Sequence, residues 1–144
     1  MTSTPAEHQV NGSYRSMTTH MPVWRVGALA SVVAAVATVV WALFAKVIDI
    51  PLEVDGEEIP VLGFGFLTLL WSVVGTALAI VFARWSKHPA PTFFVTTVAL
   101  TLLSFVPVVT ADADTATQVV LAVSHVLAAA IVIPSLAFRL ANHK

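Results

Sequence analysis

The stretch VVLAVSHVLAAAIVIPSLAF, residues 119–138, holds 20 residues without a formal charge. At a rise of about 1.5 Å per residue, a helix of this length crosses a bilayer core of about 30 Å. Three further stretches share its length and character, and we expect helices over residues 23–47, 61–84, 91–110 and 117–140. The predicted fold is an all-α membrane protein, a four-transmembrane-helix antiparallel bundle with both termini cytoplasmic.

The composition supports a membrane protein. The chain is 58% hydrophobic and 10% charged, whereas soluble domains carry about 25% charged residues. The net charge of −1 offers no basic surface to nucleic acid. There is no cysteine, which excludes disulfides, thiolate metal sites and iron–sulfur clusters. We therefore expect no cofactor and no nucleic-acid partner, and we expect the lipid bilayer to be the main partner.

The chain divides into a tail and a membrane domain. Residues 1–22 are rich in Ser, Thr, Asn, Gly and Pro, which predicts a disordered cytoplasmic tail. Residues 23–144 form the predicted four-helix transmembrane domain. The first apolar run, residues 26–45, exceeds the about 7–15 residues of a signal-peptide core, so we expect it to be retained as a helix. Gly27, Ser31 and Ala35 recur every four residues in it, which favours close packing against a neighbouring helix of the same chain.

Residues 48–60 form the longest predicted loop. Asp55-Gly56 between short apolar–polar alternations is a turn signal, so a short hairpin fits this segment. The loop holds five acids, which could bind a hard cation or form a solvated acidic surface. Their spacing does not match an EF-hand loop, which favours the solvated surface.

The basic residues predict the orientation. Cytoplasmic loops collect Lys and Arg. With both termini inside, only Lys46 of the seven basic residues falls outside. The cytoplasmic ones are Arg15, Arg25, Arg84, Lys87, Arg139 and Lys144. We predict a multi-pass protein of the plasma (inner) membrane with cytoplasmic N- and C-termini.

Polar side chains recur at one predicted depth in the four helices. Counting from the outer helix ends, His125 lies roughly 9 Å below the outer boundary of the hydrocarbon core, and one hydroxyl in each other helix lies at about 9–11 Å. These residues and the neighbouring Ser124 form the candidate polar pocket: His125, Ser124, Ser104, Thr68 and Thr38.

His125 admits two interpretations. An ionisable side chain inside a membrane suggests a functional site, such as a proton relay, a pH switch or a metal ligand. Alternatively, neutral His125 hydrogen-bonds Thr or Ser across helices and fixes their register, and we favour this structural role. A metal or haem site would need a ligand from a partner chain, because no second His, Met, Cys or carboxylate lies at that depth.

The chain resembles a family of small four-helix membrane proteins of actinobacteria that is catalogued as a domain of unknown function. The resemblance covers about residues 22–140. The matching features are Arg25, Gly75, the Ala-Arg84-Trp end of the second helix, Pro91-x-Phe93-Phe94, and SHVLAAAIVIP at residues 124–134. It implies the four-helix membrane fold and a last-helix histidine that corresponds to His125, and it implies no activity.

We predict a non-enzymatic integral membrane protein that is structural or an accessory subunit of a larger membrane assembly. Its partners would be other membrane proteins or further copies of itself. The alternative is a small-molecule or proton-handling protein with an outward-facing polar pocket at His125. We find no catalytic constellation, because the acids are confined to the predicted loops and the tail.

Overall fold

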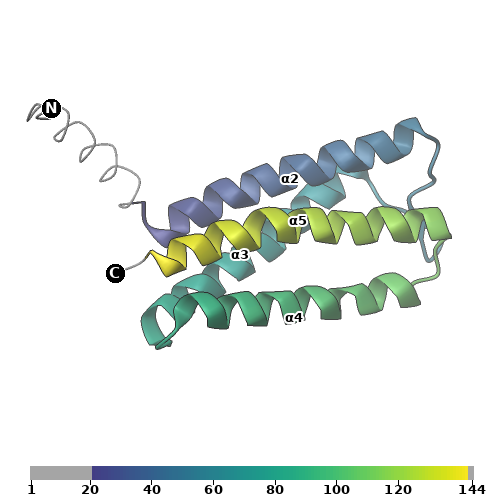
Figure 1. The fold of residues 1–144 in the computed structure, drawn as a ribbon. Helices are drawn as coiled ribbons and strands as arrows, with labels where there is room; N and C mark the ends of the chain where they lie inside the picture. The colour runs from purple at the N-terminus through teal and green to yellow at the C-terminus, as the bar shows by residue number, and fades with distance from the viewer. Residues whose placement is uncertain (1–20, 143–144) are drawn as a thin grey trace, which may run out of the picture.

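The computed structural model describes residues 21–142 and contains four long helices and a small β-hairpin (Figure 1). The predicted disordered tail therefore lies outside the described residues, except for its last two. The elements are α2 (Val23–Val47), β1 (Glu53–Val54), β2 (Glu57–Glu58), α3 (Val61–Trp85), α4 (Pro89–Thr110) and α5 (Thr115–Ala141). All four helices are long and apolar enough to span a membrane. The predicted all-α bundle of four membrane-spanning helices is confirmed.

Local signals explain where α4 and α5 begin. Pro89 opens α4 in the first turn, where a helix needs no backbone N–H donor. Asp114 precedes α5 and accepts hydrogen bonds from the backbone N–H and the hydroxyl of Thr117, at 2.8 and 2.9 Å. These hydrogen bonds hold the pKa of the Asp114 carboxyl below its ordinary value. The helix start is therefore a side-chain cap, which the Asp and Thr residues of this loop predict.

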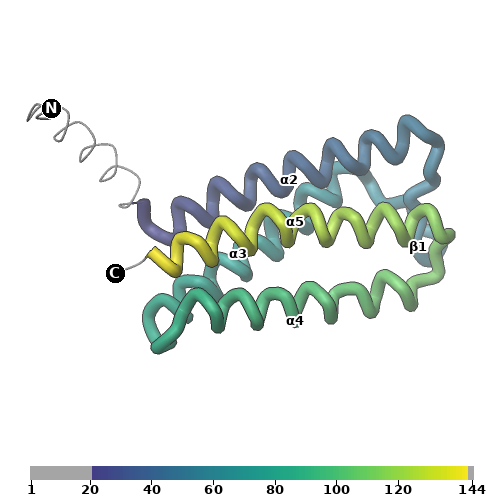
Figure 2. The backbone as a smooth tube through the Cα atoms, viewed as in Figure 1, coloured from purple at the N-terminus to yellow at the C-terminus, as the bar shows by residue number. Residues whose placement is uncertain are grey.

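The helices run alternately up and down, as the tube in Figure 2 shows. The first and last described residues lie at one end of the bundle, and the hairpin and residues 111–114 lie at the other (Figure 1). We call these the basic end and the hairpin end. Helix α2 packs mainly on α3 and α5, and α4 packs mainly on α5. Helix α5 therefore joins α4 to the rest of the bundle.

Small residues let α2 and α3 approach closely. Gly27, Ala34, Ala35 and Thr38 of α2 are all buried. A Cβ added at Gly27 would overlap the Thr76 side chain of α3, lying 2.9 Å from its Cβ. The small-residue face of the first helix thus packs within the chain. Gly75 of α3, in contrast, has open space where a Cβ would lie.

The hairpin closes one end of the bundle. Glu53 pairs with Glu58 and Val54 with Glu57 in an antiparallel register. The turn residues Asp55 and Gly56 have φ values of 55° and 81°, as the predicted two-residue hairpin turn requires. Leu52 is fully buried in an apolar cluster with α2, α3 and α5 residues. The Asp55 backbone N–H also donates to the Asp112 carbonyl at 2.8 Å, which ties the two hairpin-end loops together.

Two glycine substitutions test the close α2–α3 packing. Gly27→Ala should destabilise the bundle by about 1–3 kcal/mol, because the added methyl group overlaps a β-branched side chain that cannot swing away. Gly75→Ala is the matched control and should leave stability unchanged or slightly raised, because its Cβ meets nothing. Unfolding in mixed detergent–SDS micelles measures both. Equal effects of the two variants would contradict this packing.

Candidate functional site

Thr38 and Thr68 meet across the α2–α3 interface. Their hydroxyl oxygens lie 3.0 Å apart, and Thr38 is fully buried. The Thr68 hydroxyl also donates to the Phe64 carbonyl at 2.7 Å, and the Thr38 hydroxyl lies 3.0 Å from the Ala35 carbonyl. Two of the five predicted pocket residues are therefore joined in one small network between two helices.

The other three predicted residues bond to their own helices. Ser104 Oγ donates to the Thr101 carbonyl at 2.6 Å, and Ser124 Oγ donates to the Val120 carbonyl at 2.8 Å. His125 Nδ1 lies 2.7 Å from the Leu121 carbonyl. Within residues 21–142, no hydrogen bond links these side chains to the threonine pair. The predicted tier is thus one bonded pair between α2 and α3 and three side chains that each bond their own helix.

The partner of His125 determines its tautomer. A carbonyl oxygen can only accept, so Nδ1 carries the hydrogen and Nε2 of the neutral ring is an acceptor. The half-buried ring faces Phe105 of α4, with ring centroids 6.0 Å apart and planes tilted by 42°. Among the described residues, no group of three or more His, Cys, Asp or Glu side chains is placed to hold a metal ion.

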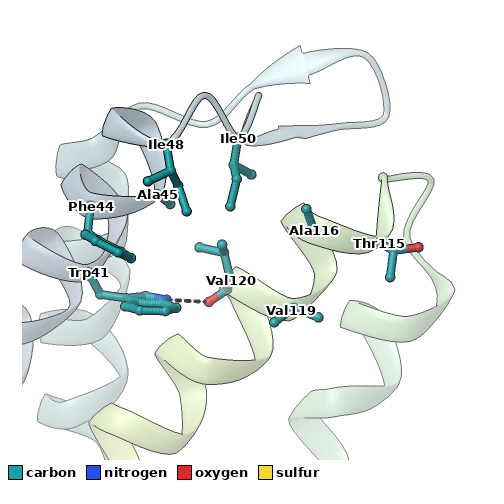
Figure 3. A pocket seen from close by; sticks show the side chains of 9 residues that line it. All are labelled: Trp41, Phe44, Ala45, Ile48, Ile50, Thr115, Ala116, Val119 and Val120. Atoms are coloured by element: carbon teal, nitrogen blue, oxygen red, sulfur yellow. Dashed lines mark hydrogen bonds between the residues drawn. The ribbon is translucent and has the colours of Figure 1, made fainter.

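A groove that sequence reasoning missed lies between α2 and α5 at the hairpin end (Figure 3). It has a volume of about 500 Å³, and its lining is almost entirely apolar. Trp41 forms one wall, and its indole N–H donates to the Val120 carbonyl at 3.1 Å. The lining residues are Trp41, Phe44, Ala45, Ile48, Ile50, Thr115, Ala116, Val119 and Val120. We call it the hairpin-end groove.

A second groove lies between the same two helices at the basic end. Its volume is about 260 Å³. It is lined by Val26, Leu29, Ala30 and Val33 of α2 and by Ile131 and Ser135 of α5. We call it the basic-end groove. Neither groove is lined by any of the five predicted pocket residues. No sequence signal marks either groove, because each depends on how α2 and α5 are placed against one another.

Charge is divided between the two ends of the bundle. The acids among residues 21–142 all lie in residues 49–58 and 112–114, at the hairpin end. Lys46 is the basic residue at this end, and it forms an ion pair with Glu58. The remaining basic residues of the described chain lie at the other end: Arg25, Arg84, Lys87 and Arg139.

Comparison with known proteins places the chain in a family. A family model described as "Family of unknown function (DUF6069)" matches residues 18–142. The chain belongs to this family. The resemblance to a family of unknown function is thereby confirmed, over a slightly longer range than residues 22–140. No curated protein and no solved structure matches the chain.

A double-mutant cycle tests whether the threonine pair holds α2 and α3 together. Thr38→Val and Thr68→Val, alone and combined, should show a coupling energy of about 0.6 kcal/mol, as is typical of hydrogen bonds between membrane helices. The Ser104→Ala and Ser124→Ala cycle is the control and should show no coupling, since each hydroxyl bonds only its own helix. Unfolding in mixed micelles measures both cycles. Coupling of the serines but not of the threonines would contradict the structure.

Proposed function

We propose that the protein is a non-enzymatic, multi-pass protein of the plasma membrane that serves as a structural or accessory subunit of a larger membrane assembly. The single observation that carries this proposal is how its intramembrane polar side chains are used. The hydroxyls of Thr38, Thr68, Ser104 and Ser124 all bond within the bundle, and none lines either groove. Polar groups used in this way stabilise a fold instead of recognising a substrate.

A second candidate function rests on His125. Its Nε2 makes no hydrogen bond to another residue of the range 21–142, although the ring is only half-buried. A neutral imidazole acceptor of this kind could take up a proton or contact a small ligand. Against this candidate, no second titratable side chain lies beside it in the described helices, since the acids are in the loops. A relay through the bundle would therefore need water or another chain.

One pair of experiments separates the two candidates. If the protein is an accessory subunit, it should run in native membrane extracts as a stoichiometric complex of larger mass, and deleting it should reduce the abundance or activity of that same complex. Purified protein in liposomes should then carry no proton flux, and His125→Ala should change neither the complex nor the flux. Proton flux that the purified protein supports and His125→Ala abolishes would overturn the proposal in favour of the second candidate.

We further propose that the basic end faces the cytoplasm. Support comes from the positive-inside rule, since Arg25, Arg84, Lys87 and Arg139 gather at that end and the acids gather at the other. The hairpin would then lie outside.

Cysteine labelling tests this orientation without background, because the chain has no cysteine. Glu57 in the hairpin and Lys87 between α3 and α4 are both exposed. In intact cells, a membrane-impermeant maleimide should label Glu57→Cys, and it should label Lys87→Cys only after permeabilisation. The reverse pattern would place both termini outside and overturn the orientation.

A further inference from the structure

The basic-end groove runs along the membrane-spanning part of the bundle. On α2 it extends from Val26 to Val33, a distance of roughly 10 Å at the helical rise. One leaflet of the hydrocarbon core is about 15 Å deep, half of the total of about 30 Å. The groove is therefore about two thirds as long as one leaflet is deep. The Ser135 hydroxyl donates to the Ile131 carbonyl at 2.6 Å, and the trough is mainly apolar.

A positive charge lies one helical turn beyond this groove, toward the basic end of the bundle. Arg139 lies one helical turn beyond Ser135 on α5, and its Nε donates to the Met21 carbonyl next to the start of α2. Its Nη1 also donates to the Asn142 carbonyl at 3.4 Å. A guanidinium group has five N–H donors, so the two bonds to backbone carbonyls hold the group in place and leave three donors free of these contacts. Such a fork matches the oxygens of a phosphate.

The charges around Arg139 would strengthen an attraction for anions. Arg25 lies one turn before Leu29 on α2 and adds a second positive charge at the same end. Its guanidinium stands over the Trp24 ring, 5.3 Å from the centroid. Within residues 21–142, the one ion pair is Lys46–Glu58 at the hairpin end, and no carboxylate of this range pairs with either arginine. An exposed Trp24 is also typical of the level of lipid headgroups.

We propose that the basic-end groove binds one anionic phospholipid, with an acyl chain between α2 and α5 and its phosphate against Arg139 and Arg25. The site is independent of the accessory role and of which side of the membrane the basic end faces. Charge complementarity identifies the occupant, because the apolar trough would take an acyl chain and the two arginines at its basic end would attract an anionic headgroup. The hairpin-end groove serves as a comparison within the same protein. It lies between the same helices, but the ionised Asp114 next to its lining residue Thr115 would repel an anionic headgroup.

Native mass spectrometry of the full chain tests this binding with lipids of identical acyl chains. The protein should retain one phosphatidylglycerol molecule at detergent concentrations at which it loses phosphatidylcholine. Glycerol phosphate without acyl chains should not bind, because the groove supplies part of the affinity. Retention of both lipids to the same extent would overturn the proposal.

Four variants distinguish lipid binding in the basic-end groove from nonspecific electrostatic attraction of lipid to the basic end. Arg139→Gln should weaken phosphatidylglycerol retention about fivefold, the effect of losing one basic contact. Lys87→Gln removes the same charge from the exposed α3–α4 turn and should leave retention unchanged. Val33→Trp should fill the basic-end groove and lower retention, whereas Val119→Trp, equally exposed on the hairpin-end groove, should not.

Two results would contradict the site. Equal losses for Arg139→Gln and Lys87→Gln would show diffuse attraction to the basic end, and full retention by Val33→Trp would show that the acyl chain lies elsewhere. Should Arg139→Gln fail to fold, because it also loses the bond to the Met21 carbonyl, the two tryptophan variants decide the outcome on their own.

Discussion

Lipid offers no hydrogen-bond partners, so a polar group in the membrane-spanning part of the chain is costly unless it finds its partner inside the protein. The helices satisfy the backbone in this way. The hydroxyl side chains follow the same rule: those of Ser31, Thr76, Thr97 and Thr101 each donate to the carbonyl four residues earlier. Among residues 21–142, no buried side-chain nitrogen or oxygen lacks a partner. Because most of these hydrogen bonds stay within one helix, few hydroxyl donors remain to form hydrogen bonds between helices.

Close packing must therefore hold the helices together. Without a hydrophobic driving force between helices in lipid, contact depends on how near the backbones can come. Helix α2 has the small residues that allow this approach, and it packs on both α3 and α5. The hydroxyl pair of Thr38 and Thr68 lies at this close contact. Close packing thus brings the two threonines within hydrogen-bonding distance, and α2 and α5 together form the seam that carries both grooves.

Features that depend on a few neighbouring residues could be predicted from the sequence. The four spans follow from charge-free length, the hairpin turn from Asp55-Gly56, and the α5 cap from Asp114 and Thr117. Depth counting also placed Thr38 and Thr68 at one level, which they share. The depth of a residue, however, does not tell which way its side chain points around the helix axis. Depth therefore could not show that Ser104 and His125 bond to their own helices. The grooves depend on the placement of helices far apart in sequence, which no local pattern records.

The α2–α5 seam is fixed by polar contacts near both ends. At the hairpin end the Trp41 indole bonds the Val120 carbonyl, and at the basic end Arg139 bonds the Met21 carbonyl. The first contact joins a side chain of α2 to a backbone carbonyl of α5. The second joins a side chain of α5 to a backbone carbonyl just before α2. Each lies near one of the grooves. Yet the two ends differ in charge: the acids among residues 21–142 lie at the hairpin end, and Arg25 and Arg139, which form no ion pair within that range, lie at the basic end. Two grooves between the same pair of helices thus lie in opposite electrostatic environments, and an anionic headgroup would be attracted at the basic end and repelled at the hairpin end.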